Sequence, residues 1–181
     1  MVSWGLCGGL DRRLRPGDII LGTEVVSDGG SIRTDQAVTS SLARRLIDAG
    51  TQVVIEPLAA ADAPVLTSGA KAELRRATGA AAVDMESLTA GAFALKQHIM
   101  FVIMRAVADP ADRDLPPVVL KAVDPDGEIN AMALIGGLIR SPGQLAGVHA
   151  AFRDSRGAFR ALKRCRGLLP GLFLGLGPAE V

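Results

Sequence analysis

Two short acidic segments each follow an apolar run with the composition of a buried strand. The first is Val83-Asp84-Met85-Glu86-Ser87, and the second closes the run Met104-Arg105-Ala106-Val107-Ala108-Asp109. Open α/β sheets bind ligands at the carboxyl ends of their strands, so Glu86 and Asp109 are predicted to meet at one sheet edge. A carboxylate that binds sugar hydroxyls, beside a second carboxyl that holds a proton, is what cleavage of an N-glycosidic bond requires.

The position of Glu86 favours a binding role. Ser87 is predicted to begin a helix, and a carboxylate at a helix N-terminus is stabilised by the helix dipole. An ionised glutamate offers acceptors for two adjacent hydroxyls, such as the 2′ and 3′ hydroxyls of a ribose. The alternative is that Asp84 and Glu86 are solvated acids at the end of a strand.

Asp109 has two interpretations that the sequence leaves open. As a general acid it would protonate N7 of a departing purine, provided that partial burial raises its pKa. Alternatively, Arg105, four residues earlier, holds Asp109 ionised in a salt bridge. The later loop acids Asp112 and Asp114 are predicted to be solvated.

Alternating strand and helix patterns predict an α/β sandwich around a buried sheet. Thr34 or Asp35 is predicted to cap the first helix, and Ser68 the second. Val2-Ser3-Trp4 resembles the end of a strand and Gly5 to Leu10 a glycine-rich turn, from which we expect the first strands of the domain to be missing. The predicted strands span 19–26, 53–55, 80–85 and 99–106, and the helices 34–49, 68–76, 86–97, 118–123, 130–140 and 144–166.

Composition narrows the class of protein. The 181 residues suit one domain, 49% are hydrophobic, and the net charge of +1 gives no general attraction to nucleic acid. Cys7 and Cys165 are too few for a disulfide framework, which predicts reduced thiols and a cytoplasmic location. The pattern contains no metal-ligand spacing, no signal peptide and no membrane-spanning run.

The C-terminal part is basic. Seven of the 20 Lys and Arg residues lie between 140 and 166, with a single acid. On a helix, Arg153, Arg156, Arg160, Lys163 and Arg164 share one sector, opposite Phe152, Ala158, Phe159, Leu162 and Cys165. This predicts either a surface helix packed on the core, or a helix lying on an anionic membrane with the apolar residues up to 174. We therefore divide the chain into residues 1–150 and a basic helix with an apolar tail, 151–181, of the same domain.

Three motifs, in order, resemble the purine nucleoside phosphorylase and nucleosidase superfamily. They are Gly5-Leu6-Cys7-Gly8-Gly9-Leu10 with the following Gly17-Asp18 strand, Val83-Asp84-Met85-Glu86, and Arg105-Ala106-Val107-Ala108-Asp109. The likeness covers residues 2–112. The opening segment, the Val-Asp-Met-Glu-Ser form and the basic tail are most similar to the hopanoid-associated phosphorylases.

The resemblance implies a three-layer α/β/α fold with a mixed sheet and a homo-oligomer. It also implies removal of adenine from adenosylhopane by phosphate, with no further cofactor. It places Glu86 on the ribose hydroxyls, Met85 against the sugar, Asp109 at the purine N7, and Gly8, with Cys7, at the nucleoside.

The chain departs from the family pattern around the phosphate. Leu6 stands where a hydroxyl residue is common, Ala108 replaces the serine before the catalytic aspartate, and the N-terminal glycine loop is absent. Arg33 is the candidate we name for phosphate. Two alternatives to phosphorolysis remain: a nucleosidase that uses water, and a non-catalytic module that binds a nucleoside or a membrane.

Overall fold

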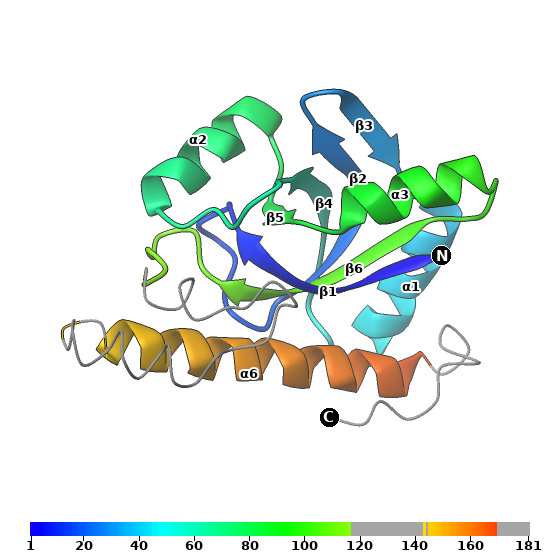
Figure 1. Cartoon of the computed structure of the whole chain (residues 1–181). Helices are drawn as coiled ribbons and strands as arrows, with labels where there is room; N and C mark the ends of the chain where they lie inside the picture. Colours follow the sequence, from blue (N-terminus) through cyan, green and yellow to red (C-terminus); the bar gives the residue numbers. More distant parts are fainter. Residues whose placement is uncertain (117–142, 144, 170–181) are drawn as a thin grey trace.

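The computed structural model of the protein describes residues 1–116, 143 and 145–169. Strands and helices alternate along this part of the chain (Figure 1). The strands are β1 (Val2–Gly9), β2 (Ile19–Ser27), β3 (Gly30–Arg33), β4 (Val53–Ala60), β5 (Ala82–Asp84) and β6 (Val102–Asp109). The helices are α1 (Gln36–Asp48), α2 (Ser68–Thr78), α3 (Ser87–Lys96) and α6 (Leu145–Leu168). The helices predicted at 118–123 and 130–140 lie outside the described residues.

The strands form one mixed sheet in the order β3-β2-β4-β5-β1-β6. β1 pairs in parallel with β6 and antiparallel with β5, and β4 pairs in parallel with both β2 and β5. The first half of β2 also pairs antiparallel with β6, from Ile19 opposite Ala106 to Gly22 opposite Ile103. This additional pairing closes β2, β4, β5, β1 and β6 into a ring, with β3 on its outside.

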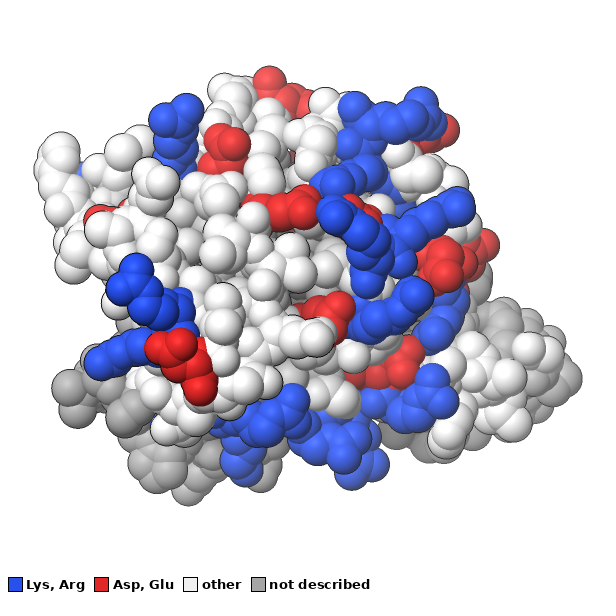
Figure 2. Space-filling model, turned by 180° about the vertical axis from the view of Figure 1, so that it is seen from behind, with Lys and Arg blue, Asp and Glu red and all other residues white. Residues whose placement is uncertain are grey.

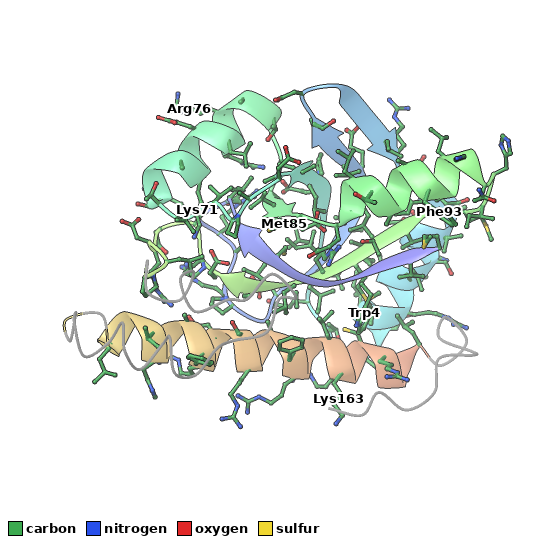
Figure 3. All side chains as sticks on the ribbon, viewed as in Figure 1. Trp4, Lys71, Arg76, Met85, Phe93 and Lys163 are labelled. Carbon is green, nitrogen blue, oxygen red and sulfur yellow. The ribbon has the colours of Figure 1, made fainter. Side chains whose placement is uncertain are left out.

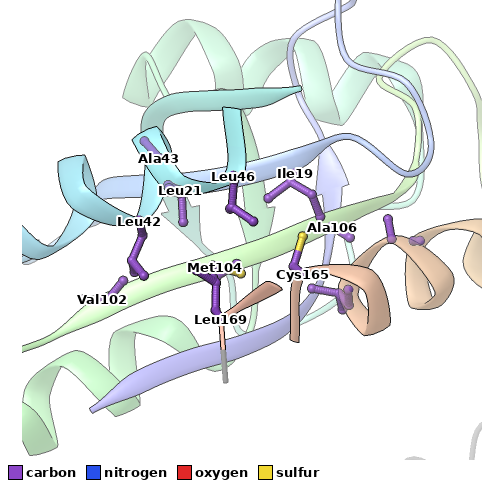
Figure 4. Close-up of a cluster of buried hydrophobic side chains, with 13 residues drawn as sticks. Ile19, Leu21, Leu42, Ala43, Leu46, Val102, Met104, Ala106, Cys165 and Leu169 are labelled. Atoms are coloured by element: carbon purple, nitrogen blue, oxygen red, sulfur yellow. The ribbon is translucent and has the colours of Figure 1, made fainter. Parts of the chain in front are cut away.

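Alternate residues of the strands supply two separate hydrophobic cores, because successive side chains of a strand point to opposite faces. Ile19 and Leu21 of β2 belong to the core beneath α1 and α6, whereas Ile20 belongs to the core that reaches Ala94 of α3. Figure 4 shows the first core, where Cys165 of α6 packs beside residues of β2, β6 and α1. Helices therefore cover the sheet from both sides, and the α/β sandwich prediction is confirmed (Figure 1).

The predicted turn at Gly5 to Leu10 is wrong, because β1 continues as a strand to Gly9. Its parallel pairing with β6 runs from Val2 opposite Val102 to Gly8 opposite Asp109. A Cβ at Gly5 would overlap Nη1 of Arg105, the residue opposite it. The glycine therefore serves the close passage of a large side chain rather than a change of chain direction.

α1 and α2 each begin directly after a residue whose side chain caps the helix. Asp35 caps α1 by accepting a hydrogen bond from the Val38 backbone N–H at 2.9 Å, one of the two predicted caps. Thr67 caps α2 in place of the predicted Ser68, whose own N–H donates to Asp114 Oδ1 at 2.7 Å. Asp114 is exposed, as predicted.

Three further strands differ from prediction, among them β6, which runs from Val102 to Asp109 instead of 99–106. β4 extends to Ala60 instead of ending at Ile55, and β3 was not predicted. Pro57 lies within the longer β4 and cannot donate to the ladder. In the structure it falls where the register between β2 and β4 shifts, so the missing N–H is tolerated there.

α6 packs on the sheet with a narrower apolar face than predicted. Ala158, Leu162 and Cys165 are buried as expected, but Phe152 and Phe159 are 38% and 59% exposed. The two aromatic rings thus lie on the outer surface together with the basic residues. The division that the sequence analysis drew between residues 150 and 151 falls within this helix.

Figure 2 shows charged residues over much of this face of the molecule, and two regions stand out. Lys and Arg gather along the lower edge, over α6, and a mixed basic and acidic region lies over α2 and its neighbours. In that mixed region Asp11 pairs with Arg13 and Arg75, and hydrogen bonding from Arg13 lowers the pKa of Asp11 to about 2. No helix within the described residues is long and apolar enough to cross a bilayer.

Candidate active site

β1 brings the two acidic segments together because it lies between β5 and β6. Gly8 is opposite Val83 of β5 on one side and opposite Asp109 of β6 on the other. The pairing of β1 with β6 shifts register between Cys7 and Gly8, so Ala108 is the extra residue of a bulge. Bulges next to functional sites re-aim the following side chain, here that of Asp109.

A cavity of about 170 Å³ opens at this meeting of strand ends. Glu86 and Asp109 both line it, as the sequence predicted, and so do Met85, Gly8 and Cys7. The remaining lining is mostly apolar: Leu6, Ala63, Pro64, Val65, Val83, Asp84, Ala108 and Leu115. Figure 3 shows Met85 at the centre of the molecule, in the region where these strands end.

Glycine at position 8 keeps the cavity open next to the acid. A Cβ there would lie 3.3 Å from Asp109 Oδ1 and 3.4 Å from Val83 Cγ1, which is a crowded position. A larger side chain would therefore press on the carboxyl or fill the space beside it. Cys7 next to it is buried, and this burial raises the pKa of its thiol, so it is not a thiolate nucleophile.

Asp84 is a structural acid rather than an exposed one. Its side chain is buried beside Arg105, with Nε of the arginine 2.5 Å from Asp84 Oδ2. Ser87 donates to Asp84 through its backbone N–H, at 3.2 Å, and through its hydroxyl. Arg105 also donates from Nη2 to Ser3 Oγ at 2.7 Å and to Ser87 Oγ at 3.1 Å. The network ties β1, β5, β6 and the start of α3 together beneath the cavity.

Glu86 is held by the same arginine but faces solvent. Nη1 of Arg105 lies 3.2 Å from Glu86 Oε2, while the glutamate side chain is 69% exposed. Glu86 is the N-cap residue of α3, yet its side chain makes no capping hydrogen bond. Its carboxylate is therefore oriented from below by one buried cation and can accept hydrogen bonds from a ligand above.

Asp109 is held by a lysine that the sequence analysis missed. Lys71 of α2 is fully buried, and its Nζ lies 2.5 Å from Asp109 Oδ2. The alternative salt bridge from Arg105 to Asp109 does not form, since Arg105 pairs with Asp84 and Glu86 and Asp109 pairs with Lys71. Figure 3 shows Lys71 on the inner side of α2 and Arg76 on its outer side.

Burial controls the ionisation of Asp109. Desolvation raises its pKa, the Lys71 ammonium lowers it by charge and hydrogen bonding, and the net shift is upward. Arg113 and Asp154 act on it more weakly, in opposite directions. A carboxyl with a raised pKa keeps its proton to a higher pH than usual, which suits a proton donor.

Arg33 does not join this group. It is exposed on β3 and is not part of the cavity lining. None of the described residues that line the cavity is basic. Among the described residues, no cluster of three His, Cys, Asp or Glu side chains could hold a metal ion.

A family comparison identifies the fold and its class. The family model of the phosphorylase superfamily matches residues 1–140. The chain belongs to the phosphorylase superfamily. It is an enzyme of this superfamily, and its mixed α/β sheet is the fold of the solved structures compared below. No curated protein sequence matches the chain significantly.

Solved structures of nucleoside-cleaving enzymes share this fold. A 5′-methylthioadenosine/S-adenosylhomocysteine nucleosidase from Helicobacter pylori is 15% identical with a TM-score of 0.61, covering 92% of this chain and 67% of that one. The futalosine hydrolase of H. pylori is 16% identical with a TM-score of 0.58, covering 90% and 66%. An S-adenosylhomocysteine nucleosidase from Streptococcus pyogenes is 16% identical with a TM-score of 0.57, covering 84% and 66%.

Proposed function

We propose that this enzyme cleaves the N-glycosidic bond of an adenine nucleoside. The observation that carries the proposal is the placement of Glu86 and Asp109 in the lining of one cavity, on either side of Gly8. The nucleosidases that share the fold act on adenine nucleosides according to their names, which supports adenine as the base.

In this proposal the two acids have separate tasks. Glu86, ionised and oriented by Arg105, accepts hydrogen bonds from the ribose hydroxyls, and Met85 contacts the sugar. Asp109 transfers its proton to N7 as the bond from C1′ to N9 breaks and its electron pair passes to the purine. The nucleophile then adds its oxygen to C1′, and in the case of water it releases a proton that restores Asp109.

The 5′ substituent is proposed to be apolar. Leu6, Pro64, Val65 and Leu115 contribute to the cavity lining, and an apolar lining accepts a hydrophobic group without a desolvation penalty. This supports the substrate that the sequence resemblance implied, an adenosine with a hopane substituent, and equally a smaller alkyl or alkylthio group.

Water is the alternative to phosphate as the nucleophile. The resemblance implies phosphate, but a phosphate ion is usually held by basic side chains or converging N–H groups. No basic residue lines the cavity among the described residues, and this observation favours water. Adenine release measured with and without phosphate separates the two: an unchanged rate without phosphate supports the nucleosidase.

Replacement of Asp109 tests the proposal directly. Asp109→Asn keeps the size of the side chain but has no acidic proton, so adenine release from 5′-methylthioadenosine or a longer 5′-alkylthio analogue should fall about 10²- to 10⁴-fold. Asp112→Asn is the matched control, because Asp112 is exposed on the same loop and outside the lining. Wild-type activity in Asp109→Asn would refute the role.

We also propose that α6 contacts an anionic membrane surface. Phe152 and Phe159 are exposed beside Arg156, Arg160 and Lys163, which are also exposed. Figure 3 shows Lys163 on the side of α6 that faces away from the sheet. Exposed aromatic rings next to basic residues are the composition of an interfacial helix, and a membrane location would suit a lipid-linked nucleoside.

The protein is further proposed to form a homo-oligomer. Phe93, Leu95, Ile99 and Met100, at the end of α3 and in the loop after it, are all exposed by 44% or more. An apolar group of this kind, on a side of the molecule away from α6, is typical of a subunit contact (Figure 3).

A further inference from the structure

Lys71 is the only residue of α2 that is fully buried, and it is a lysine. The ammonium of Lys71 makes three hydrogen bonds, all to one short loop: to Asp109 Oδ2 at 2.5 Å, to the Pro110 carbonyl at 2.8 Å and to the Arg113 carbonyl at 2.9 Å. An ammonium has three donors, so this loop satisfies the whole group.

The burial of this lysine has no clear explanation in stability alone. Removing an ammonium from water is costly, and a buried ion pair often contributes no more than apolar side chains of similar volume would. A lysine buried without acceptors would lose its proton. Here three acceptors keep the charge in place, one of them on the residue proposed as the catalytic acid.

We infer that Lys71 is a positioning residue that fixes Oδ2 of Asp109 and the loop behind it, so that Oδ1 is presented to the leaving base. The inference rests on the proposed function. Gly8 borders the carboxyl group from the other side, because a Cβ there would lie 3.3 Å from Oδ1 and 3.4 Å from Oδ2. The carboxyl is thus held from α2 on one side and given room by β1 on the other.

The arrangement fits the proton transfer in the proposed reaction. In the neutral acid Oδ1 carries the proton and Oδ2 accepts from Lys71. When the proton moves from Oδ1 to N7, the electron pair of the broken O–H bond stays on the carboxylate, next to the ammonium. Lys71 therefore stabilises the form of Asp109 that exists after the base has been protonated, without touching the substrate.

Other charged groups around Asp109 modify this effect and come from neighbouring elements. Arg113 lies on the loop after β6 and lowers the pKa of Asp109, whereas Asp154 of α6 raises it. Arg113 Nη1 pairs with Asp154, so the two act on Asp109 in opposite directions, and Cys7 of β1 stays neutral. Lys71 is the cation in direct contact with the carboxyl.

Two variants test the inference: Lys71→Met, which matches the length of the side chain without charge, and Lys71→Gln, which keeps a donor. Lys96→Met is the matched control, because Lys96 is exposed at the end of α3. The side-chain carboxyl of Asp109 is titrated by carbon-13 NMR, with its resonance assigned from Asp109→Asn. The pH profile of kcat for adenine release is measured in parallel.

Both variants should move the titration of Asp109 upward by about one pH unit or more, because an attractive charge has been removed. The alkaline limb of the kcat profile should move in the same direction, since the acid keeps its proton to a higher pH. On the acidic plateau of the profile, where Asp109 is fully protonated, kcat should fall about 10- to 100-fold, because the carboxylate left after proton transfer has lost its cation, with KM within about threefold because Lys71 does not contact substrate.

An unchanged titration in a folded variant would overturn the inference, and so would lower thermal stability with unchanged kcat, which marks a purely structural lysine. If neither variant folds, the wild type still decides: the nitrogen-15 shift of the Lys71 ammonium must follow the titration of Asp109, and independence of the two would also overturn it. A wild type that titrates as expected but releases no adenine refutes the proposed function and leaves the Lys71 contact intact.

Discussion

Arg105 forms ion pairs with both acids of the segment 83–87, Asp84 and Glu86. Its guanidinium is 3% exposed and lies 2.5 Å from Asp84 and 3.2 Å from Glu86. Asp84 is buried with it, so that pair is fixed, whereas Glu86 extends into solvent. A carboxylate that is anchored at one oxygen and solvated elsewhere is oriented without losing its capacity to accept hydrogen bonds.

Replacement of Glu86 should therefore affect substrate binding. Glu86→Gln keeps one acceptor but loses the charge, and a hydrogen bond to a charged group contributes about 1.5–3 kcal/mol. We expect kcat/KM for an adenine nucleoside to fall about 10- to 100-fold, and a 2′,3′-dideoxy analogue to lose this sensitivity. Glu73→Gln on α2, where Glu73 is exposed, serves as control. An equal loss with the dideoxy analogue would contradict a contact to the ribose hydroxyls.

The sequence predicted the two acids well and their partners poorly. Glu86 and Asp109 could be placed together because each follows a strand, and strand ends of one sheet edge converge. A salt bridge from Arg105 to Asp109 looked reasonable at a spacing of four, but both residues lie on β6, where four residues span about 13 Å. The burial of Lys71 could not be predicted from the sequence, since a lysine in a polar helix is usually solvated.

At the scale of elements, α1 and α6 cover the same hydrophobic core but differ in the side chains that they bury. α1 buries Thr39, Leu42, Ala43 and Leu46. α6 instead buries mainly small residues, because Ala158 and Ala161 bring its backbone close to the sheet. The larger rings of Phe152 and Phe159 do not fit this close contact and lie outside it, which periodicity alone could not show.

The membrane proposal for α6 is best tested with point variants, because removing the helix would uncover the core beneath Cys165. Phe152→Ser with Phe159→Ser should reduce flotation with vesicles that contain anionic lipid about tenfold or more, since two aromatic anchors are lost. Binding should also weaken at high salt, because the basic residues act by charge. Phe93→Ser is the matched control on α3. Equal flotation of all three proteins would exclude this contact.

At the scale of the whole molecule, closure of the sheet explains why so short a chain forms a site. β1 pairs with β5 and β6 at once, and β2 returns to pair with β6, so the strand ends that carry Val83, Gly8 and Asp109 are held from several sides. The sequence predicted alternating strands and helices but not this pairing. The antiparallel pairing of β2 with β6 joins strands that are far apart along the chain, so local sequence patterns could not predict it.

The same view of the molecule separates two apolar surfaces, one on α6 and one at the end of α3. If the α3 surface is a subunit contact, the protein should exceed the 18.7 kDa mass of one chain in light scattering after size-exclusion chromatography. Phe93→Glu with Met100→Glu should return it to that mass, because charges in an apolar interface are costly to desolvate. Phe159→Glu should leave the assembly unchanged, as its ring lies on α6. A wild type that stays monomeric at high concentration would contradict this contact. An assembly that persists in the variant with both acidic substitutions would also exclude the α3 surface, and would leave the exposed rings of α6 as the alternative contact.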